Sequence, residues 1–214
     1  MLRNLPLVVF SHLRWDFVYQ RPQHLLSRIA RNRPVFFIEE PVQDLYYAPF
    51  LELNTPAPNV VVGRPHTPFA SWGFTDEQLP YLTRFVAEMV EQQELADFVV
   101  WLYTPMALPL ARTLRPRAVV FDVMDELSAF AGAPQEIKDR EAAALAWADV
   151  VFTGGPSLYR AKLGRHENLH CFPSSVDAAH FARAREVAEA ADQAHLPHPR
   201  LGFYGVIDER MDLG

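Results

Sequence analysis

Short apolar segments alternate along the chain with longer segments whose apolar residues recur at helical spacing. The apolar segments fall at 7–10, 35–38, 60–62, 98–102, 119–121, 150–153, 169–172 and 201–206. Between them, the spacing predicts helices over 20–32, 80–94, 134–147, 156–163 and 178–194, with a short one after Thr104-Pro105. Strands that are apolar throughout and alternate with helices are typical of a parallel sheet covered on both faces. The pattern therefore predicts an α/β fold.

Local signals mark where several of these elements begin and end. Pro22 suits the first turn of the helix over 20–32, and Thr104 is placed to cap the short helix that follows it. Gly164 comes directly after 156–163 and is expected to stop that helix. Thr75 and Gln78 have the spacing of a capping box, but Pro80 lies too deep for a helix that starts there. We therefore expect a short turn before the helix over 80–94.

The two ends of the pattern are less regular. The passage 39–72 shows no regular pattern apart from the strand at 60–62. The last apolar segment, 201–206, has no crossover helix after it, although a parallel strand normally continues through one. We therefore expect residues 1–199 to form one domain and residues 200–214 to begin a second α/β domain. The sequence HLPHP at 195–199 is the nearest approach to a linker.

Composition narrows the possible partners and the compartment. Half of the 214 residues are hydrophobic, which is enough for a sizeable core, and the formal net charge of −6 argues against a nucleic-acid binder. The single cysteine, Cys171, lies in an apolar segment and is expected to be a buried thiol in a reducing compartment. The start of the chain does not resemble a signal peptide, and no apolar run approaches the ~20 residues of a membrane span. These features predict a cytoplasmic protein, with peripheral association at the inner face of the membrane left open.

Familiar cofactor and metal motifs are absent. The first predicted strand is followed by SHLRWDF, where a dinucleotide site would carry GxGxxG, and no GxxxxGK[ST], GxSxG, HExxH or paired CxxC occurs. The eight histidines are scattered, without metal-ligand spacing. We therefore expect neither a bound metal nor a resident cofactor.

Large polar and aromatic residues instead follow one predicted strand after another. The first connection, SHLRWDFVYQRPQHL, carries Arg14, Trp15, Asp16, Tyr19, Gln20, Arg21 and His24. Later strands are followed by Tyr103, Asp122, Asp125, Glu126, Gly154, Gly155 and Ser174. Because the carboxyl ends of parallel strands share one edge of the sheet, and ligands bind at that edge, the pattern predicts a binding site there.

Each of these signals also has a purely structural interpretation. Gly154-Gly155 could be a tight turn, and Asp122 and Asp125 could brace the segment that follows them. Trp15 and Tyr19 could pack the floor of the crevice, and Arg14 and Asp16 could be solvated loop charges. The coincidence of all of them at one edge favours a site, because structural accidents need not fall at the same ends of five strands.

Five segments of the chain resemble a bacterial group of GT-B glycosyltransferases. These are family-1-like enzymes, similar to a teichuronic-acid biosynthesis glycosyltransferase. The matching segments are WDFVYQRPQHL, FDVMDELSAF, ADVVFTGGPSLYRAK, NLHCFPSSVDAAHF and LGFYGVIDERMDL, which together span nearly the whole chain. Such enzymes have two Rossmann-like domains that face each other across a cleft. The resemblance implies that this chain is the N-terminal, acceptor-binding domain, and that it lacks most of the nucleotide-sugar site.

The resemblance also implies roles for the residues at the strand ends. Glycosyl transfer needs an oriented acceptor hydroxyl and neutralisation of the departing diphosphate. Asp125 and Asp16 are the expected catalytic residues, with Asp125 as a base. The expected acceptor-binding residues are Arg14, Trp15, Tyr19, Gln20, His24, Tyr103, Asp122 and Glu126. The first loop lacks the glycines of many relatives, so the expected donor-phosphate contacts are Arg21, Gly154, Gly155 and Ser174.

Two other functions remain open from the residues alone. The chain could belong to a GT-B nucleotide-sugar epimerase or hydrolase, or it could be a non-catalytic sugar-binding module. In the glycosyltransferase interpretation, the partners are a nucleotide-sugar, a glycan or lipid-linked acceptor, and the missing C-terminal domain. We also expect weak self-association through the face that the second domain would cover.

Overall fold

The computed structural model describes residues 4–130 and 132–202. Contacts divide the chain into two compact units, 1–174 and 175–214. The predicted boundary between 199 and 200 stays a prediction. Most of the predicted strand at 201–206 lies outside the described residues.

A single sheet forms the first unit. Within the described residues, its nine strands are β1 (Leu7–Ser11), β2 (Val35–Glu39), β3 (Val42–Gln43), β4 (Phe50–Ala57), β5 (Val60–Thr67), β6 (Val99–Leu102), β7 (Ala118–Val123), β8 (Val150–Thr153) and β9 (Leu169–Cys171). Their order is β3-β5-β2-β1-β6-β7-β8-β9, and β4 pairs with β5. All pairings are parallel except that of β4 with β5.

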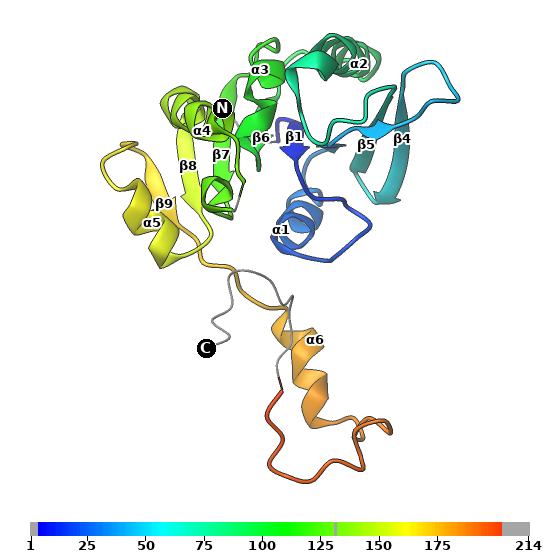
Figure 1. Ribbon diagram of the computed structural model, residues 1–214, viewed down its shortest axis with the longest axis vertical. Helices are drawn as coiled ribbons and strands as arrows, with labels where there is room; N and C mark the ends of the chain where they lie inside the picture. Colours follow the sequence, from blue (N-terminus) through cyan, green and yellow to red (C-terminus); the bar gives the residue numbers. More distant parts are fainter. Residues whose placement is uncertain (1–3, 131, 203–214) are drawn as a thin grey trace. The chain divides into compact units, whose positions relative to one another are not determined.

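Helices cover the two faces of this sheet (Figure 1). Helix α1 (Arg21–Ile29) lies on one face, and α2 (Leu79–Gln92), α3 (Leu108–Ala111) and α4 (Gln135–Trp147) lie on the other. Helix α5 (Pro156–Lys162) connects β8 with β9. Within the described part of this unit, short 3₁₀ helices span Asp76–Gln78, Pro105–Ala107 and Leu127–Ala129. The α/β layers predicted from the hydrophobic pattern are present.

The central strands are buried on both sides, which explains their uninterrupted apolar sequences. Val8 and Phe10 of β1 pack into one core with α2 to α4, whereas Leu7 and Val9 pack into a second core with α1. Fully burying a side chain of this size contributes about 1.5–3 kcal/mol. The two cores together hold the carboxyl ends of β1, β2, β6 and β7 in fixed register.

The passage 39–72 is more regular than its sequence suggested. It contains β3 and a hairpin in which β4 runs antiparallel to β5, and β5 extends to Thr67 rather than ending at Val62. Asn59 in the hairpin turn has φ of 59°, a left-handed conformation that asparagine tolerates. Strand β4 lies at the sheet edge and is mostly exposed, so it lacks the apolar alternation that reveals a half-buried strand.

The predicted boundary signals mostly act as expected. The Thr104 side chain accepts a hydrogen bond from the Met106 N–H at the start of its short helix, and Gly164 has φ of 75° after α5. Gln78 does not complete a capping box. It is fully buried, accepts from the Thr67 hydroxyl at 2.6 Å, and donates to the Gly73 carbonyl at 3.0 Å. Gln78 therefore holds the loop before α2.

The second unit contains less helix than predicted. Helix α6 (Ala178–Ala182) is capped by the Asp177 side chain and followed only by a 3₁₀ turn at Arg183–Arg185, so the helix predicted over 178–194 is wrong beyond Ala182. All five residues of α6 are exposed. Isolated helices gain most of their stability from a buried face, and this segment has none.

Two smaller expectations concern Cys171 and membrane-spanning helices. Cys171 is half-buried rather than fully buried. Among the helices of the described residues, none has the length and apolar character needed to cross a membrane.

Candidate functional site

The strand order reverses at β1, which has β2 on one side and β6 on the other. In open α/β sheets, ligands bind at the carboxyl edge where the order reverses. The loop SHLRWDFVYQRPQHL begins at this point, with Ser11 as the last residue of β1 and His12 directly after it. The topology therefore places the first predicted loop where a ligand site is expected.

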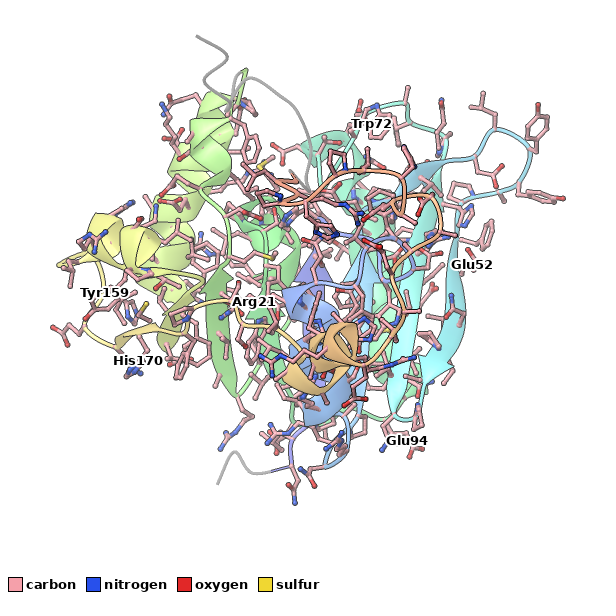
Figure 2. All side chains as sticks on the ribbon, turned by 90° about the horizontal axis from the view of Figure 1, so that it is seen from below. Arg21, Glu52, Trp72, Glu94, Tyr159 and His170 are labelled. Carbon is pink, nitrogen blue, oxygen red and sulfur yellow. The ribbon has the colours of Figure 1, made fainter. Side chains whose placement is uncertain are left out.

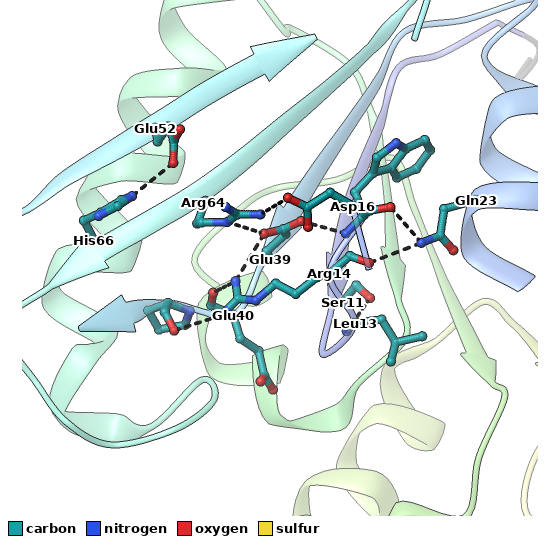
Figure 3. A network of polar contacts seen from close by, with 12 residues as sticks. Ser11, Leu13, Arg14, Asp16, Gln23, Glu39, Glu40, Glu52, Arg64 and His66 are labelled. Carbon is teal, nitrogen blue, oxygen red and sulfur yellow. Dashed lines mark hydrogen bonds and ion pairs between the residues drawn. The ribbon is translucent and has the colours of Figure 1, made fainter. Parts of the chain in front are cut away.

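A buried carboxylate, Glu39 at the end of β2, organises the first half of this loop (Figure 3). Glu39 is fully buried and accepts hydrogen bonds from the Trp15 backbone N–H at 2.7 Å, the Arg14 Nη1 at 3.2 Å and the Arg64 Nε at 2.7 Å. The Arg64 Nη2 also donates to the Asp16 carboxylate at 3.0 Å. A buried charge is tolerated only when it is paired and hydrogen-bonded, so these contacts fix the loop against β2 and β5.

Asp16, Arg14 and Trp15, which the sequence predicts as site residues, each contact other residues of the protein. Asp16 keeps an exposed carboxylate (66% of its side chain), and the hydrogen bond from Arg64 is the main cause that lowers its pKa. An ionised carboxylate of low pKa is a weak base at neutral pH. The Arg14 guanidinium also donates to the Glu40 carbonyl, and the Trp15 ring packs edge-on against Phe37 at 5.2 Å. An acceptor-binding role for Arg14 and Trp15 and a catalytic role for Asp16 stay predictions.

The second half of the loop leads into α1. Gln20 precedes the helix, and its backbone N–H donates to the Gln23 side chain at 3.0 Å. The amide of Gln23, a fully buried residue missed by sequence reasoning, donates to the carbonyls of Arg14, Trp15 and Val18. Tyr19 is 58% exposed, and its ring lies edge-on to His24 at 4.5 Å. Tyr19 and His24 thus form a partly accessible aromatic pair beside the start of α1.

Arg21 and Asp122 form an ion pair between α1 and β7. The Arg21 Nε donates to both carboxylate oxygens at 3.2 and 3.1 Å, and the Nη2 donates to Oδ1 at 3.0 Å. The Arg21 Nη1 donates to the Phe172 carbonyl at 2.6 Å (Arg21 is labelled in Figure 2). Burial raises the pKa of Asp122 and outweighs the lowering effect of Arg21. The guanidinium predicted to contact a donor phosphate is bound to a protein carboxylate here.

Two buried donors act on Asp122. The Trp101 indole N–H and the Tyr103 hydroxyl both contribute, as side-chain hydrogen-bond donors, to lowering the pKa of Asp122. Burial, followed by the Asp122 charge, raises the pKa of Tyr103 well above its usual value. Tyr103 is only 2% exposed, so its ring offers no open face for a sugar in this arrangement.

The loop after β7 places two predicted carboxylates differently. Asp125 is exposed. Glu126 receives the Lys162 Nζ at 2.8 Å on both oxygens and the Ser128 hydroxyl at 3.0 Å. Partial burial acts to raise the pKa of Glu126, but the Lys162 hydrogen bonds hold it below its usual value. Asp125 is therefore the accessible carboxylate of the two.

The residues after β8 and β9 that were predicted to contact a phosphate take part in close packing between neighbouring loops. The Gly154 N–H donates to the Val123 carbonyl at 2.9 Å, and the Ser174 N–H donates to the Gly154 carbonyl at 3.1 Å. A Cβ at Gly154 would lie 3.0 Å from the Met124 carbonyl oxygen, whereas one at Gly155 would meet nothing within 4 Å. Gly154 thus lets the two loops approach closely, and the role of Gly154, Gly155 and Ser174 toward a phosphate stays a prediction.

His12 is another residue at this edge that sequence reasoning missed. Its Nδ1 is buried and has no hydrogen-bond partner among the described residues. Burial lowers the pKa of His12, and the Asp125 charge and the Tyr103 carbonyl partly oppose that effect. The neutral imidazole therefore predominates at pH 7, and the Asp125 charge acts against that effect. Its position directly after β1, at the strand-order reversal, is the signal that could have revealed it.

Glu40 was also missed by sequence reasoning. Burial raises its pKa to about 7 against the opposing charge of Arg14, and its carboxylate points away from the Arg14 network in Figure 3. A Cβ added at Gly73, which has φ of 84°, would lie 3.2 Å from a Glu40 carboxylate oxygen. Glu40 is thus a carboxyl group that can change charge near neutral pH at this edge.

Other surfaces offer less chemistry. Among residues 4–130 and 132–202, no group of three or more metal-binding side chains is present. A hollow of about 610 Å³ lies between the end of α2 and residues 113–115, and it contains none of the predicted site residues. Trp72, in the loop after β5, is 92% exposed (Figure 2). The carboxyl edge around His12 and Asp125 remains the best candidate site.

Comparisons with known proteins support the fold. No protein-family model matches the chain, and no curated protein matches it in sequence. A solved structure of sucrose-phosphate synthase from Thermosynechococcus elongatus aligns with a TM-score of 0.63 at 12% identity, over 85% of this chain and 52% of that one. This chain therefore spans about half the length of that synthase.

A second structure of the same synthase aligns with a TM-score of 0.55 at 12% identity, over 85% of this chain and 95% of that one. The alpha,alpha-trehalose 6-phosphate synthase of Burkholderia multivorans aligns at 0.44 and 10% identity, over 74% and 41%, which is too distant to use. The likeness to the first two confirms the predicted Rossmann-like α/β class.

Proposed function

We propose that this chain is the acceptor-binding domain of a glycosyltransferase that moves a sugar from a nucleotide-sugar to a hydroxyl of a glycan or other cell-envelope acceptor. The fold shared with sucrose-phosphate synthase supports the enzyme class. The observation that carries the proposal is the buried Nδ1 of His12, which has no hydrogen-bond partner among the described residues and lies at the strand-order reversal. The charge of Asp125, at the same edge of the sheet, acts to raise the pKa of His12. A neutral imidazole beside a carboxylate is suited to take a proton from a hydroxyl.

The proposed reaction is a direct displacement. The imidazole of His12 takes the proton of the acceptor hydroxyl as that oxygen forms a bond to the anomeric carbon. The bond from the anomeric carbon to the diphosphate breaks, and the nucleoside diphosphate leaves with the electron pair. The Asp125 carboxylate stabilises the resulting imidazolium. Displacement at one face inverts the anomeric carbon.

The remaining residues support this step. Tyr19 and His24 are accessible beside α1 and are proposed to contact the acceptor. Glu39 and Arg64 hold the first half of the loop that leads to α1. In this proposal the nucleotide-sugar is a substrate rather than a resident cofactor. A second domain, beyond this chain, is proposed to bind the nucleotide.

The test uses the longest protein that the gene encodes. It is incubated with a panel of nucleotide-sugars and cell-envelope glycans, and release of nucleoside diphosphate is measured with and without acceptor. General-base catalysis contributes about 100- to 10,000-fold, so His12→Gln should lower kcat by that factor, and Asp125→Asn by less. His195→Gln, at an exposed histidine of the second unit, is the matched control and should leave kcat unchanged.

Each alternative function has its own outcome in this assay. Release of diphosphate without any acceptor would support the epimerase or hydrolase. Glycan binding without release from any donor would support a non-catalytic module. A His12→Gln enzyme with undiminished acceptor-dependent kcat would overturn the role given to His12.

A further inference from the structure

Asp125 is exposed, so packing around its own side chain does not hold it. Its neighbours along the chain are held firmly. Glu126 accepts from the Lys162 Nζ at 2.8 Å through both carboxylate oxygens, and the Ser128 hydroxyl adds a third contact at 3.0 Å. The position of Asp125 therefore depends on a neighbouring residue that is anchored to α5.

Lys162 is an unusual anchor because it is only 2% exposed. Its Nζ also donates to the Glu141 carboxylate on α4 at 2.9 Å, and Arg165 donates to the same oxygen at 2.9 Å. Two cations and two carboxylates thus balance within one cluster. Removing one partner from a buried ion pair leaves an uncompensated charge, so this geometry resists displacement.

A second contact holds the same segment from the other side. The Gly154 N–H donates to the Val123 carbonyl at 2.9 Å, and Gly154 packs so closely on Met124 that a Cβ would lie 3.0 Å from the Met124 carbonyl oxygen. The turn between β8 and α5 and the cluster around Lys162 therefore clamp residues 123–126 together.

We propose that Lys162 is a positioning residue for the site: through Glu126 it holds residues 124–126, so that the Asp125 carboxylate stays at the carboxyl edge of the sheet, where His12 also lies. The proposal rests on the proposed function only for the role of Asp125 and His12 in taking the proton of the acceptor hydroxyl. The placement itself is a property of the folded chain and can be measured without substrate.

The experiment is a double-mutant cycle read by NMR. The His12 ring signals are assigned by their absence in His12→Gln, and the His12 pKa is measured in wild type, Asp125→Asn, Lys162→Met and the double variant. Because the Asp125 charge raises the pKa of His12, Asp125→Asn should lower it. In the Lys162→Met background, the downward shift in the His12 pKa that Asp125→Asn causes should be less than half of the shift in the wild-type background.

Three further variants separate positioning from folding. Lys138→Met removes the chain's other lysine, which is exposed on α4, and should leave the full Asp125 shift. Lys162→Arg keeps the positive charge and should restore most of the shift that Asp125→Asn causes in the His12 pKa. If circular dichroism shows that Lys162→Met does not fold, Glu126→Gln, which weakens the same contact at a half-buried position, takes its place in the cycle.

An Asp125 shift as large in a folded Lys162→Met or Glu126→Gln protein as in wild type would overturn the proposal. This outcome is distinct from failure of the proposed function. A protein with the expected cycle but no transferase activity would keep Lys162 as a positioning residue and reject the glycosyltransferase.

Discussion

Burial disfavours the ionised form of the Glu40 carboxyl group. Burial raises its pKa from 4.5 to about 7, and the Arg14 charge only partly compensates. Between these two values the folded protein binds more protons than the unfolded chain, so the free energy of unfolding falls as the pH rises. The ionised group at pH 8 therefore opposes folding by up to about 3 kcal/mol.

Replacing Glu40 by glutamine should remove this dependence. Glu40→Gln is expected to raise the free energy of unfolding by about 2–3 kcal/mol at pH 8 and to change it little at pH 4, where the acid is mostly protonated in both states. Urea titrations at pH 4, 6 and 8 measure the difference. Glu91→Gln, at an exposed position on α2, is the control and should show no such trend. An equal effect of Glu40→Gln at pH 4 and pH 8 would contradict the raised pKa.

At the scale of single residues, the sequence revealed which loop matters but not the partners of its side chains. Arg14 and Asp16 were recognisable as large polar groups after a strand. Glu39 and Arg64, which bind them, are 25 to 48 positions away in the chain, and no local pattern links such residues. His12 was passed over because a lone histidine is usually structural, and only its buried, unpartnered Nδ1 distinguishes it.

At the scale of elements, Arg21 joins three of them. It lies at the start of α1, pairs with Asp122 of β7, and donates to the Phe172 carbonyl just after β9. Only 7% of the Arg21 side chain and none of the Asp122 side chain are exposed. The ion pair therefore ties the helix on one face of the sheet to the strands beyond β6.

Breaking this pair from one side should be costly. Arg21→Met leaves the Asp122 charge buried without its partner and is expected to lower the free energy of unfolding by about 3–5 kcal/mol. Adding Asp122→Leu should recover most of that loss, because two apolar groups replace both charges. Arg31→Met, at an exposed arginine just beyond α1, should change stability by less than about 0.5 kcal/mol. A double variant as unstable as Arg21→Met would contradict the assignment, and urea unfolding measures all four proteins.

The same scale shows where element prediction succeeds. The central strands were predictable because burial on both faces leaves an uninterrupted apolar run, as in 7–10 and 35–38. Strand β4 was missed because an exposed edge strand carries polar residues on both faces. The helix over 178–194 was overpredicted for the opposite reason: alanine favours helix locally, but no buried face of this segment stabilises a long one.

At the scale of the whole molecule, both hydrophobic cores lie within the first unit. The cores draw on residues from Leu5 to Leu169, and the ion pairs of Arg21, Glu39 and Lys162 also close within 1–174. In the second unit, residues 178–199 are exposed and bury no core. The first unit thus holds the interactions from which a folded domain gains its stability.

A fragment of residues 1–174 should therefore fold alone. We expect its near-ultraviolet circular dichroism to match that of the full chain, and its free energy of unfolding to lie within about 1 kcal/mol, because residues 175–202 bury little apolar area. A fragment ending at residue 149 should not fold, since it removes β8 and the Lys162 partner of Glu126 and Glu141. If the 1–174 fragment instead unfolded without cooperativity while a fragment of 1–199 behaved as the full chain, residues 175–199 would belong to the folding unit. The domain boundary predicted from the sequence, between 199 and 200, would then be the correct one.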